Sequence, residues 1–367
     1  MCDQGANNMA DIFEYLRWRG DLTLEKAPFN EVDAVILARF SYIPFEGVSL
    51  GRLGTVCQAL LGLPDIHDRV LMADDHRLLQ ALSESPRYGE MEVFSYEQKL
   101  DLQTEIQFAA LTVQLEPGRS YVIFRGTDNT LVGWKEDFNM CFGPVPSQRL
   151  AVEYLNRVGR SISGNIVVGG HSKGGNLAVY AGAFCEKAIQ EKITTVYNFD
   201  GPGFHDEVLE TERYRQVCQR IKTFVPQSSV VGMMLGHGES FVIVHSGESG
   251  LLQHDVYSWE MERDRFSYVQ AVTNSSRFVD STLKHWLAEV EPEQRERFVD
   301  AVYAVLLETN AKTVKEVSEN KFGNGKILLR ALKKLEEEDR KAVLQALRAL
   351  ARCAKMSMSV ISKPGRK

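Results

Sequence analysis

The feature that most constrains the fold of this chain is a short apolar strand that turns at once into a helix, over residues 165–180. The turn reads Gly170-His171-Ser172-Lys173-Gly174, with a serine between two glycines. A backbone that reverses from strand to helix in so few residues crowds itself, and glycine removes the Cβ atoms that would clash. The pattern predicts a nucleophile elbow, in which a strained serine stands above a sheet. The alternative is a surface turn with an incidental serine.

An elbow of this kind favours one type of chemistry. A serine hydroxyl held in such a turn beside a base can attack an acyl carbon, which makes Ser172 the candidate nucleophile. The backbone N–H of Lys173 is expected to face the same site, where it can donate to an oxyanion.

Composition narrows the class of protein. The 367 residues are 44% hydrophobic and 25% charged, which is enough for a sizeable core in one large domain or two smaller ones. The net charge is −6 and no basic stripe stands out, so nucleic acid is not an expected partner. The six cysteines form no Cys-x-x-Cys pair, which argues against zinc and redox motifs. With no signal-like or membrane-spanning apolar run, we expect a cytoplasmic protein with free thiols.

The order of apolar runs predicts an α/β fold. Short strands alternate with helices over about 107–256, which indicates a mostly parallel sheet with helices on both faces. Strands are expected to stop near residue 264, and helices are expected over 291–307 and 326–353. The predicted division is a mostly helical N-terminal segment (1–100), a core (101–262) and a C-terminal helical extension (263–367). This extension either packs on the core, forms a separate binding module or joins two copies into a homo-oligomer.

A second loop upstream carries residues suited to an oxyanion hole. An apolar strand leads into Phe124-Arg125-Gly126-Thr127, and Trp134 and Asp137 follow. An oxyanion hole needs a second backbone N–H from a loop after an earlier strand. Gly126 lets the backbone approach a substrate, and Thr127 can donate through its N–H and its hydroxyl. The alternative is a plain turn at the end of a strand.

Taken together and in this order, these motifs resemble the class 3 (fungal-type) lipases, over about 107–259. The N-terminal patterns at 15–22 and 28–33 are similar to a family of uncharacterised bacterial lipase-like α/β hydrolases. The resemblance implies an α/β-hydrolase fold, with Ser172 as the nucleophile and Thr127 as the oxyanion residue. It also implies that Asp137 holds the Thr127 hydroxyl in place.

The base is sought downstream of the serine, because the triad in this fold follows the order serine, acid, histidine. His254 lies shortly after the last apolar strand, where a loop carrying the base is expected. His245, at the end of a strand, is the second candidate. His205 comes too soon after a turn, and His237 lies in a flexible glycine-flanked turn.

The acid is where the chain departs from the class 3 pattern. Those lipases carry an aspartate three residues before a proline, but here that position is Thr223, before Pro226. We favour Asp200 as the substitute, because it directly follows a buried strand at the carboxyl edge of the sheet, where ligands bind in such folds. Asp200 alternatively caps its own turn. Asp255 and Glu239 are weaker candidates.

The sequence therefore predicts a serine hydrolase, lipase-like or esterase-like, that acts on a small-molecule or lipid ester. Thioesters and amides are alternative substrates. Acyl transfer by such a triad needs neither a metal nor an organic cofactor. A second hypothesis is a catalytically silent relative that binds a ligand or partner, and the missing aspartate at Thr223 supports it. The apolar stretch Val230–Leu235 lines an acyl pocket, contributes to a lid or is ordinary core.

Overall fold

The computed structural model of the protein describes residues 10–101, 103–128, 130–140, 142–309 and 321–361. The chain splits into two compact units made of interleaved segments. Unit 1 comprises Met1–Gln98, Phe108–Gly126 and Arg149–Val272, and unit 2 comprises Lys99–Gln107, Thr127–Gln148 and Thr273–Lys367. The linear three-part division expected from the sequence stays a prediction.

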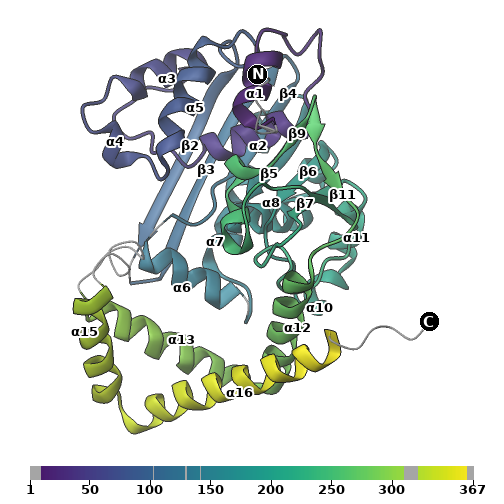
Figure 1. Ribbon diagram of the computed structural model, residues 1–367. Coiled ribbons are helices and arrows are strands. Elements are labelled where there is room, and N and C mark those ends of the chain that lie inside the picture. The colour runs from purple at the N-terminus through teal and green to yellow at the C-terminus, as the bar shows by residue number, and fades with distance from the viewer. Residues whose placement is uncertain (1–9, 102, 129, 141, 310–320, 362–367) are drawn as a thin grey trace, which may run out of the picture. The chain divides into compact units, whose positions relative to one another are not determined.

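A nine-stranded sheet is the centre of unit 1, although residues 99–101 and 106–107 of two of its strands fall in unit 2 (Figure 1). In sheet order its strands are β1 (Gly51–Arg52), β2 (Glu92–Asp101), β3 (Ile106–Glu116), β4 (Arg119–Phe124), β5 (Asn165–His171), β6 (Ile193–Phe199), β7 (Ile221–Pro226), β8 (Phe241–Val244) and β11 (Tyr268–Val269). Strands β4 to β8 are parallel, whereas β1–β2, β3–β4 and β8–β11 pair antiparallel. A separate hairpin joins β9 (Met261–Glu262) to β10 (Arg265–Phe266).

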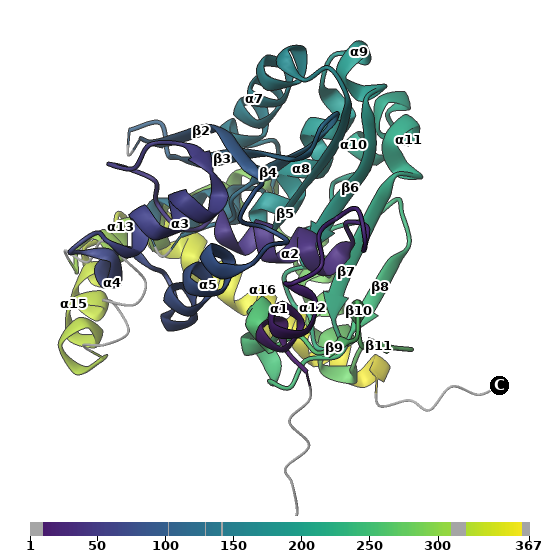
Figure 2. The same cartoon turned by 90° about the horizontal axis from the view of Figure 1, so that it is seen from above.

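Helices cover both faces of this sheet, as Figure 2 shows. The helices of unit 1 are α1 (Ile12–Arg19), α2 (Glu31–Phe40), α3 (Leu53–Leu61), α4 (Ile66–Arg69), α5 (Ala73–Glu84), α7 (Pro146–Ser161), α8 (Lys173–Phe184), α9 (Lys187–Gln190), α10 (Asp206–Leu209) and α11 (Glu212–Cys218), with two 3₁₀ turns, η1 (Gly250–His254) and η2 (Val256–Ser258). On one face the Tyr121 hydroxyl of β4 donates to the Ala34 carbonyl of α2. On the other face the ring of Phe124 contacts Tyr154 of α7. The predicted α/β fold class is confirmed.

The buried central strands explain why the sequence showed them as continuous apolar runs. Ile166, Val167 and Val168 of β5 are all fully buried, because a parallel strand with helices on both sides exposes neither face. Because the strand is packed on both faces, the position of the end of β5 is fixed, and so is the start of the turn that follows.

Three elements differ from the expectation. Strands do not stop at residue 264, since β10 and β11 lie beyond it, and β11 extends the sheet by pairing with β8. Two-residue strands are too short to give an alternating pattern. Strand β2 was not indicated either, because it is an outer strand in which polar residues such as Gln98 and Lys99 are exposed.

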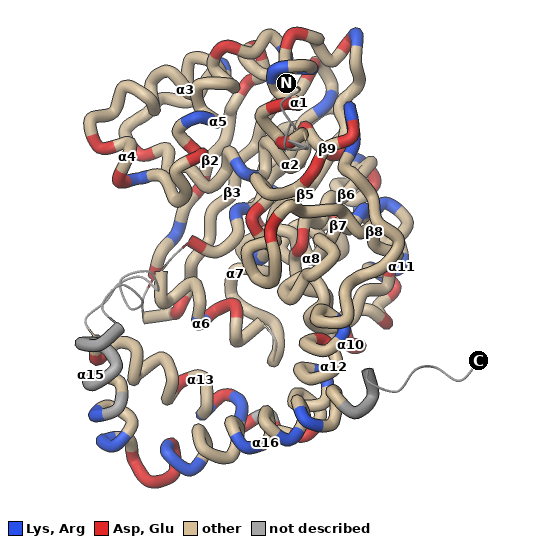
Figure 3. The backbone as a smooth tube through the Cα atoms, viewed as in Figure 1, with Lys and Arg blue, Asp and Glu red and all other residues tan. Residues whose placement is uncertain are grey.

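Unit 2 is mainly helical. Its helices are α6 (Leu131–Met140), α12 (Asn274–Glu289), α13 (Pro292–Leu307), α15 (Lys321–Lys334) and α16 (Glu337–Ile361). The Trp286 indole of α12 donates to the Ala346 carbonyl of α16 over 2.9 Å, and Arg297 of α13 pairs with Glu338 of α16 at 2.8 Å. The acidic residues of α16, Glu337, Glu338 and Asp339, lie in its first turn, and Lys and Arg carry the charge along the rest of the helix (Figure 3).

The helix predicted at 291–307 is confirmed as α13, but the single helix predicted over 326–353 is wrong. Two non-helical residues, 335 and 336, separate α15 from α16. Charge at the break agrees with the helix dipole: Lys333 and Lys334 end α15, and Glu337 and Glu338 begin α16.

Within the described ranges, each helix is too short or too polar to cross a membrane. The described cysteines, Cys57, Cys185, Cys218 and Cys353, are free thiols, while Cys2 and Cys141 lie outside the described residues. Among the same residues, no cluster of three His, Cys, Asp or Glu side chains could hold a metal ion.

A buried ion pair ties the N-terminal helices of unit 1 together. Asp33 of α2 and Arg87 are both fully buried, and Arg87 Nε donates to Asp33 Oδ1 over 2.7 Å. The hydroxyls of Tyr15 and Tyr88 donate to the same carboxylate oxygen at 3.0 and 2.6 Å. The carboxylate of Asp33 thus joins α2 to side chains from two other segments, Tyr15 of α1 and the pair Arg87 and Tyr88.

Replacing this carboxylate should destabilise the protein strongly. We expect Asp33→Ala to lower the free energy of unfolding by about 3–5 kcal/mol, because it leaves the Arg87 guanidinium buried without its charged partner. The matched control, Asp74→Ala, removes an exposed carboxylate of α5 and should change stability by no more than about 0.5 kcal/mol. Denaturant titration of both variants measures the difference, and equal values would contradict the prediction.

Candidate active site

The turn between β5 and α8 has the strained geometry that its sequence predicts. Ser172 stands alone between the last residue of the strand and the first residue of the helix, with φ 58° and ψ −133°. Residues with a side chain rarely adopt this region, so surrounding contacts must hold it. The Ser172 N–H donates to the Phe199 carbonyl over 2.9 Å, and the Ser172 carbonyl accepts from the Gly175 N–H over 2.8 Å.

Two glycines let other backbone segments approach this turn closely. A Cβ at Gly174 would lie 2.1 Å from the Phe124 carbonyl oxygen, inside the contact limit of any real side chain. A Cβ at Gly126 would lie 2.0 Å from the Tyr42 hydroxyl and 3.1 Å from Ser172 Cβ. The end of β4 is therefore pressed against the serine turn, and only glycine fits at these two positions.

The predicted acid and base are hydrogen-bonded to each other. His254 Nδ1 lies 2.6 Å from Asp200 Oδ2. The Asp200 side chain is 1% exposed and that of His254 is 27% exposed, so a buried carboxylate faces a partly accessible imidazole. Because a carboxylate only accepts, Nδ1 carries the proton and Nε2 is left as the nitrogen that can take one up.

The second carboxylate oxygen of Asp200 has its own partners, which the sequence did not indicate. Asp200 Oδ1 accepts from the Ser229 hydroxyl over 2.5 Å and from the Gly232 N–H over 3.1 Å. The turn after β6 is capped instead by Asn198, whose side chain accepts from the Gly201 N–H over 2.9 Å. In the sequence, the only indication of these partners was Gly232, within the apolar stretch Val230–Leu235, and Ser229, directly before it.

His171 links the base to the serine turn. Its Nε2 lies 2.8 Å from the His254 carbonyl oxygen, and its Nδ1 lies 2.9 Å from the Tyr42 hydroxyl. The two imidazole rings have centroids 4.6 Å apart. Burial lowers the pKa of His171 well below its ordinary value, and His254 and Arg39 add to this effect. A neutral ring donates from Nε2 to the carbonyl and accepts at Nδ1, which matches both contacts.

The other candidates have different partners. His245 Nδ1 lies 2.6 Å from Glu260, and His237 Nδ1 lies 3.2 Å from Glu239. The side chain of Asp255 accepts from the Tyr257 N–H and so caps η2.

Glu239 occupies the neighbourhood of the missing family aspartate. Its Oε1 accepts from the Thr223 hydroxyl over 2.5 Å, and the Tyr214 hydroxyl also donates to this carboxylate. Burial alone would raise the pKa of Glu239, but hydrogen bonds from His237, Thr223 and Tyr214 outweigh it and lower the value to about 2. A carboxylate is thus present near position 223, but it is bonded to His237.

The candidate oxyanion residues lie in different units. In unit 1, Lys173 is buried and opens α8, so its backbone N–H lies at the positive end of the helix dipole. In unit 2, the Thr127 hydroxyl lies 2.6 Å from both carboxylate oxygens of Asp137. Thr127 directly follows Gly126 in the chain.

The sequence over residues 82–304, more than half of the chain, matches the model of the Mbeg1-like family. The chain belongs to the Mbeg1-like family. This assignment agrees with the lipase-like α/β-hydrolase fold that the motifs implied. Among proteins with curated descriptions, none matches the chain.

This Mbeg1-like chain is also similar, distantly, to solved lipase structures. M37 lipase is 13% identical over 56% of this chain and 70% of its own, with a TM-score of 0.37. Lipase II from Rhizopus niveus is 12% identical over 65% and 86%, with a TM-score of 0.35. The Rhizomucor miehei lipase–propeptide complex is 14% identical over 53% and 67%, with a TM-score of 0.33.

The buried neutral His171 of this Mbeg1-like protein should make its stability depend on pH. The unfolded chain takes up a proton at this histidine near pH 6.5, whereas the folded chain resists it, so stability falls as pH drops below about 6.5. One such proton contributes a slope of up to about 1.4 kcal/mol per pH unit. His171→Gln should therefore lose less unfolding free energy between pH 7 and pH 5 than the wild type does.

Denaturant titrations across this range measure the two slopes. His67→Gln is the matched control, because His67 is exposed, and its slope should equal that of the wild type. Parallel slopes for His171→Gln and the wild type would show that His171 does not resist protonation.

Proposed function

We propose that this protein is a serine hydrolase that cleaves carboxylic esters through an acyl-enzyme on Ser172. The observation that carries the proposal is the 2.6 Å contact between His254 Nδ1 and Asp200, in the same unit as a strained serine turn. An acid that fixes the tautomer of a histidine is what a serine nucleophile requires. The Mbeg1-like family assignment is consistent with this chemistry at the level of a lipase-like fold.

In the first half of the reaction, Ser172 Oγ attacks the ester carbonyl carbon and passes its proton to His254 Nε2. The carbonyl π-electrons move to oxygen, which becomes an oxyanion. Asp200 stabilises the imidazolium that forms, through the hydrogen bond at Nδ1. When the oxyanion collapses, the bond to the alcohol breaks and the alcohol leaves with the proton from His254.

In the second half, a water molecule gives its proton to His254 Nε2 and attacks the acyl-enzyme. The second tetrahedral oxyanion collapses, the bond to Ser172 Oγ breaks, and the serine recovers its proton from His254. The products are a carboxylic acid and an alcohol.

The oxyanion is proposed to be bound by backbone N–H groups of Lys173 and Thr127. Since the Thr127 hydroxyl donates to Asp137, its proton is committed, and the backbone N–H is the group left for the oxyanion. Asp137 would then act by holding Thr127 in place.

The test of the proposed triad is labelling with a fluorophosphonate probe, which reacts with an activated serine whatever the natural substrate is. We expect the wild type to be labelled and Ser172→Ala not to be. His254→Ala and Asp200→Asn should each slow labelling strongly, by up to about 10⁴-fold for the aspartate, because the asparagine reverses the tautomer of the histidine.

The matched controls for this experiment are the histidine of another His–carboxylate pair, His245, and the acid next to the base, Asp255. His245→Ala and Asp255→Asn should label at close to the wild-type rate. A wild type that is not labelled would refute the enzyme hypothesis and favour the catalytically silent relative. A control variant that abolishes labelling would reassign the base or the acid.

Thr127→Val tests which group of Thr127 faces the oxyanion. Loss of one oxyanion donor slows such a reaction by about 100-fold or more. If the backbone N–H of Thr127 is the donor, Thr127→Val loses only the hydrogen bond to Asp137, and labelling should slow by less than that. Thr130→Val, in the same loop, is the control and should be close to wild type. A loss of 100-fold or more in Thr127→Val would show that the hydroxyl itself donates.

The substrate class is a proposal as well. A lipid ester follows from the family resemblance, and thioesters and amides are alternative acyl donors for the same residues. A cytoplasmic location, and assembly through the C-terminal helices, stay predictions from the sequence.

A further inference from the structure

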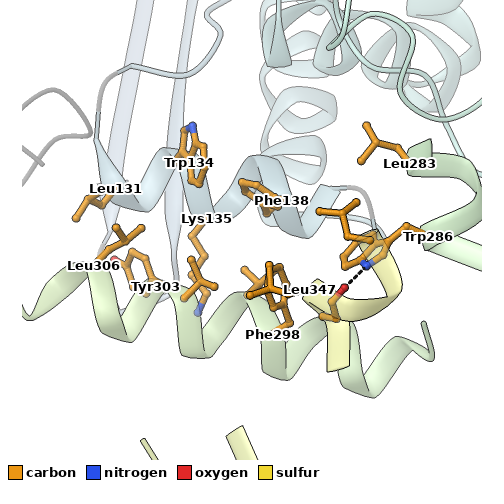
Figure 4. A pocket seen from close by; sticks show the side chains of 14 residues that line it. Leu131, Trp134, Lys135, Phe138, Leu283, Trp286, Phe298, Tyr303, Leu306 and Leu347 are labelled. Atoms are coloured by element: carbon orange, nitrogen blue, oxygen red, sulfur yellow. Dashed lines mark hydrogen bonds between the residues drawn. The ribbon is translucent and has the colours of Figure 1, made fainter. Parts of the chain in front are cut away.

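A cavity of about 280 Å³ lies wholly within the helical unit 2. Its walls come from α6, α12, α13 and α16, which are joined into one unit although they are far apart in the sequence. Figure 4 shows Phe298, Tyr303 and Leu306 projecting from α13 toward α6, from which Lys135 extends in return.

The wall of this cavity is almost entirely apolar. Each of the lining side chains is aliphatic or aromatic except Lys135, and two polar groups of the wall, the Trp286 indole and the Lys135 ammonium, already have partners. The Trp286 indole N–H donates to the Ala346 carbonyl, as the dashed line in Figure 4 marks. Lys135 Nζ lies 2.5 Å from Glu105 and 2.6 Å from Asp300. Water would find few partners along this wall, and the cavity opens to solvent where Trp134 and Leu347 are exposed.

The volume sets the size of the ligand. An apolar cavity of about 150 Å³ takes up benzene, which has six carbon atoms. By proportion, about 280 Å³ has room for about ten to twelve carbon atoms. The lining side chains are spread along α6 and α13 (Figure 4), an arrangement that suits a single unbranched alkyl chain of that length better than a rigid ring system.

The charge of the wall indicates which polar end a bound alkyl chain can carry. Lys135 is the only charged residue among those lining the cavity, and its two carboxylate partners already exceed its single positive charge. A free carboxylate would therefore gain no cationic partner from this wall, and near Lys135 it would be repelled by the two carboxylates that already pair with it, Glu105 and Asp300. An uncharged end, such as an alcohol or a glyceryl ester, meets no such repulsion.

We propose that this cavity binds one uncharged single-chain amphiphile with an alkyl chain of about ten to twelve carbons. The proposal does not depend on Ser172 or on hydrolysis, because all of the lining residues lie in unit 2 and the readout is binding alone.

The test is calorimetric titration of the full chain with 1-alkanols from six to sixteen carbons. Affinity should rise roughly fourfold per methylene, the equivalent of burying one CH₂ group. The rise should stop at about ten to twelve carbons, where the cavity is full. Decanoate should bind more weakly than 1-decanol. Affinity that keeps rising to sixteen carbons, or tighter binding of decanoate, would overturn the assignment.

Variants localise the binding. Val302→Phe and Ala346→Leu add carbon atoms inside the cavity, and each should weaken 1-decanol binding by at least about tenfold. Ala304→Phe, at an exposed position of α13, is the matched control and should bind like the wild type. Ser172→Ala should also bind like the wild type, which separates this site from the proposed active site.

Two cavity variants are used because one of them can overpack the unit. Circular dichroism and the melting temperature show which variants are folded. A folded cavity variant that binds 1-decanol as the wild type does would refute the proposal, and so would a wild type that binds none of the alcohols.

Discussion

The backbone strain at Ser172 is the constraint on which the rest of the candidate site depends. A serine holds φ at 58° only because β5, α8 and the end of β4 leave no other path for the chain. Gly174 allows the Phe124 carbonyl to press against the helix start, and Gly126 itself can lie against the serine because it has no Cβ. The parallel strands supply the rigidity, since β5 is buried on both faces and cannot shift without disturbing two helical layers.

His171 extends this rigidity to the base. It directly precedes Ser172, and its ring bonds to the His254 carbonyl and to Tyr42. Tyr42 in turn follows helix α2, whose Asp33 joins the buried network with Arg87. The N-terminal segment therefore supports the site through the Tyr42 hydroxyl, which contacts the His171 imidazole.

The sequence was most informative where local pattern and burial agree. Strands β4 to β7 were predictable because parallel strands buried on both faces leave continuous apolar runs, and the elbow was predictable from its glycines. The pairing of Asp200 with His254 was a weaker prediction, because loops 54 residues apart must meet. Ser229 and Gly232 were missed because ordinary loop residues hold the carboxylate through a hydroxyl and a backbone N–H. The cavity of unit 2 could not be predicted from the sequence, because residues of four separate helices form it.

The edge strands of the nine-stranded sheet affect whether copies of this chain can associate through their sheets. On one side the last strand, β11, is only two residues long, and on the other side β1 covers only Glu92 and Val93 of β2. The remainder of β2 carries exposed polar residues, among them Gln98 and Lys99. The two-residue β11 offers a neighbouring strand little to pair with, and on the longer β2 charged residues such as Lys99 oppose pairing although Phe94 and Leu100 are also exposed. Backbone pairing between sheets, the route by which β-rich proteins grow into fibrils, is thereby disfavoured in a protein whose central strands would otherwise be well suited to it.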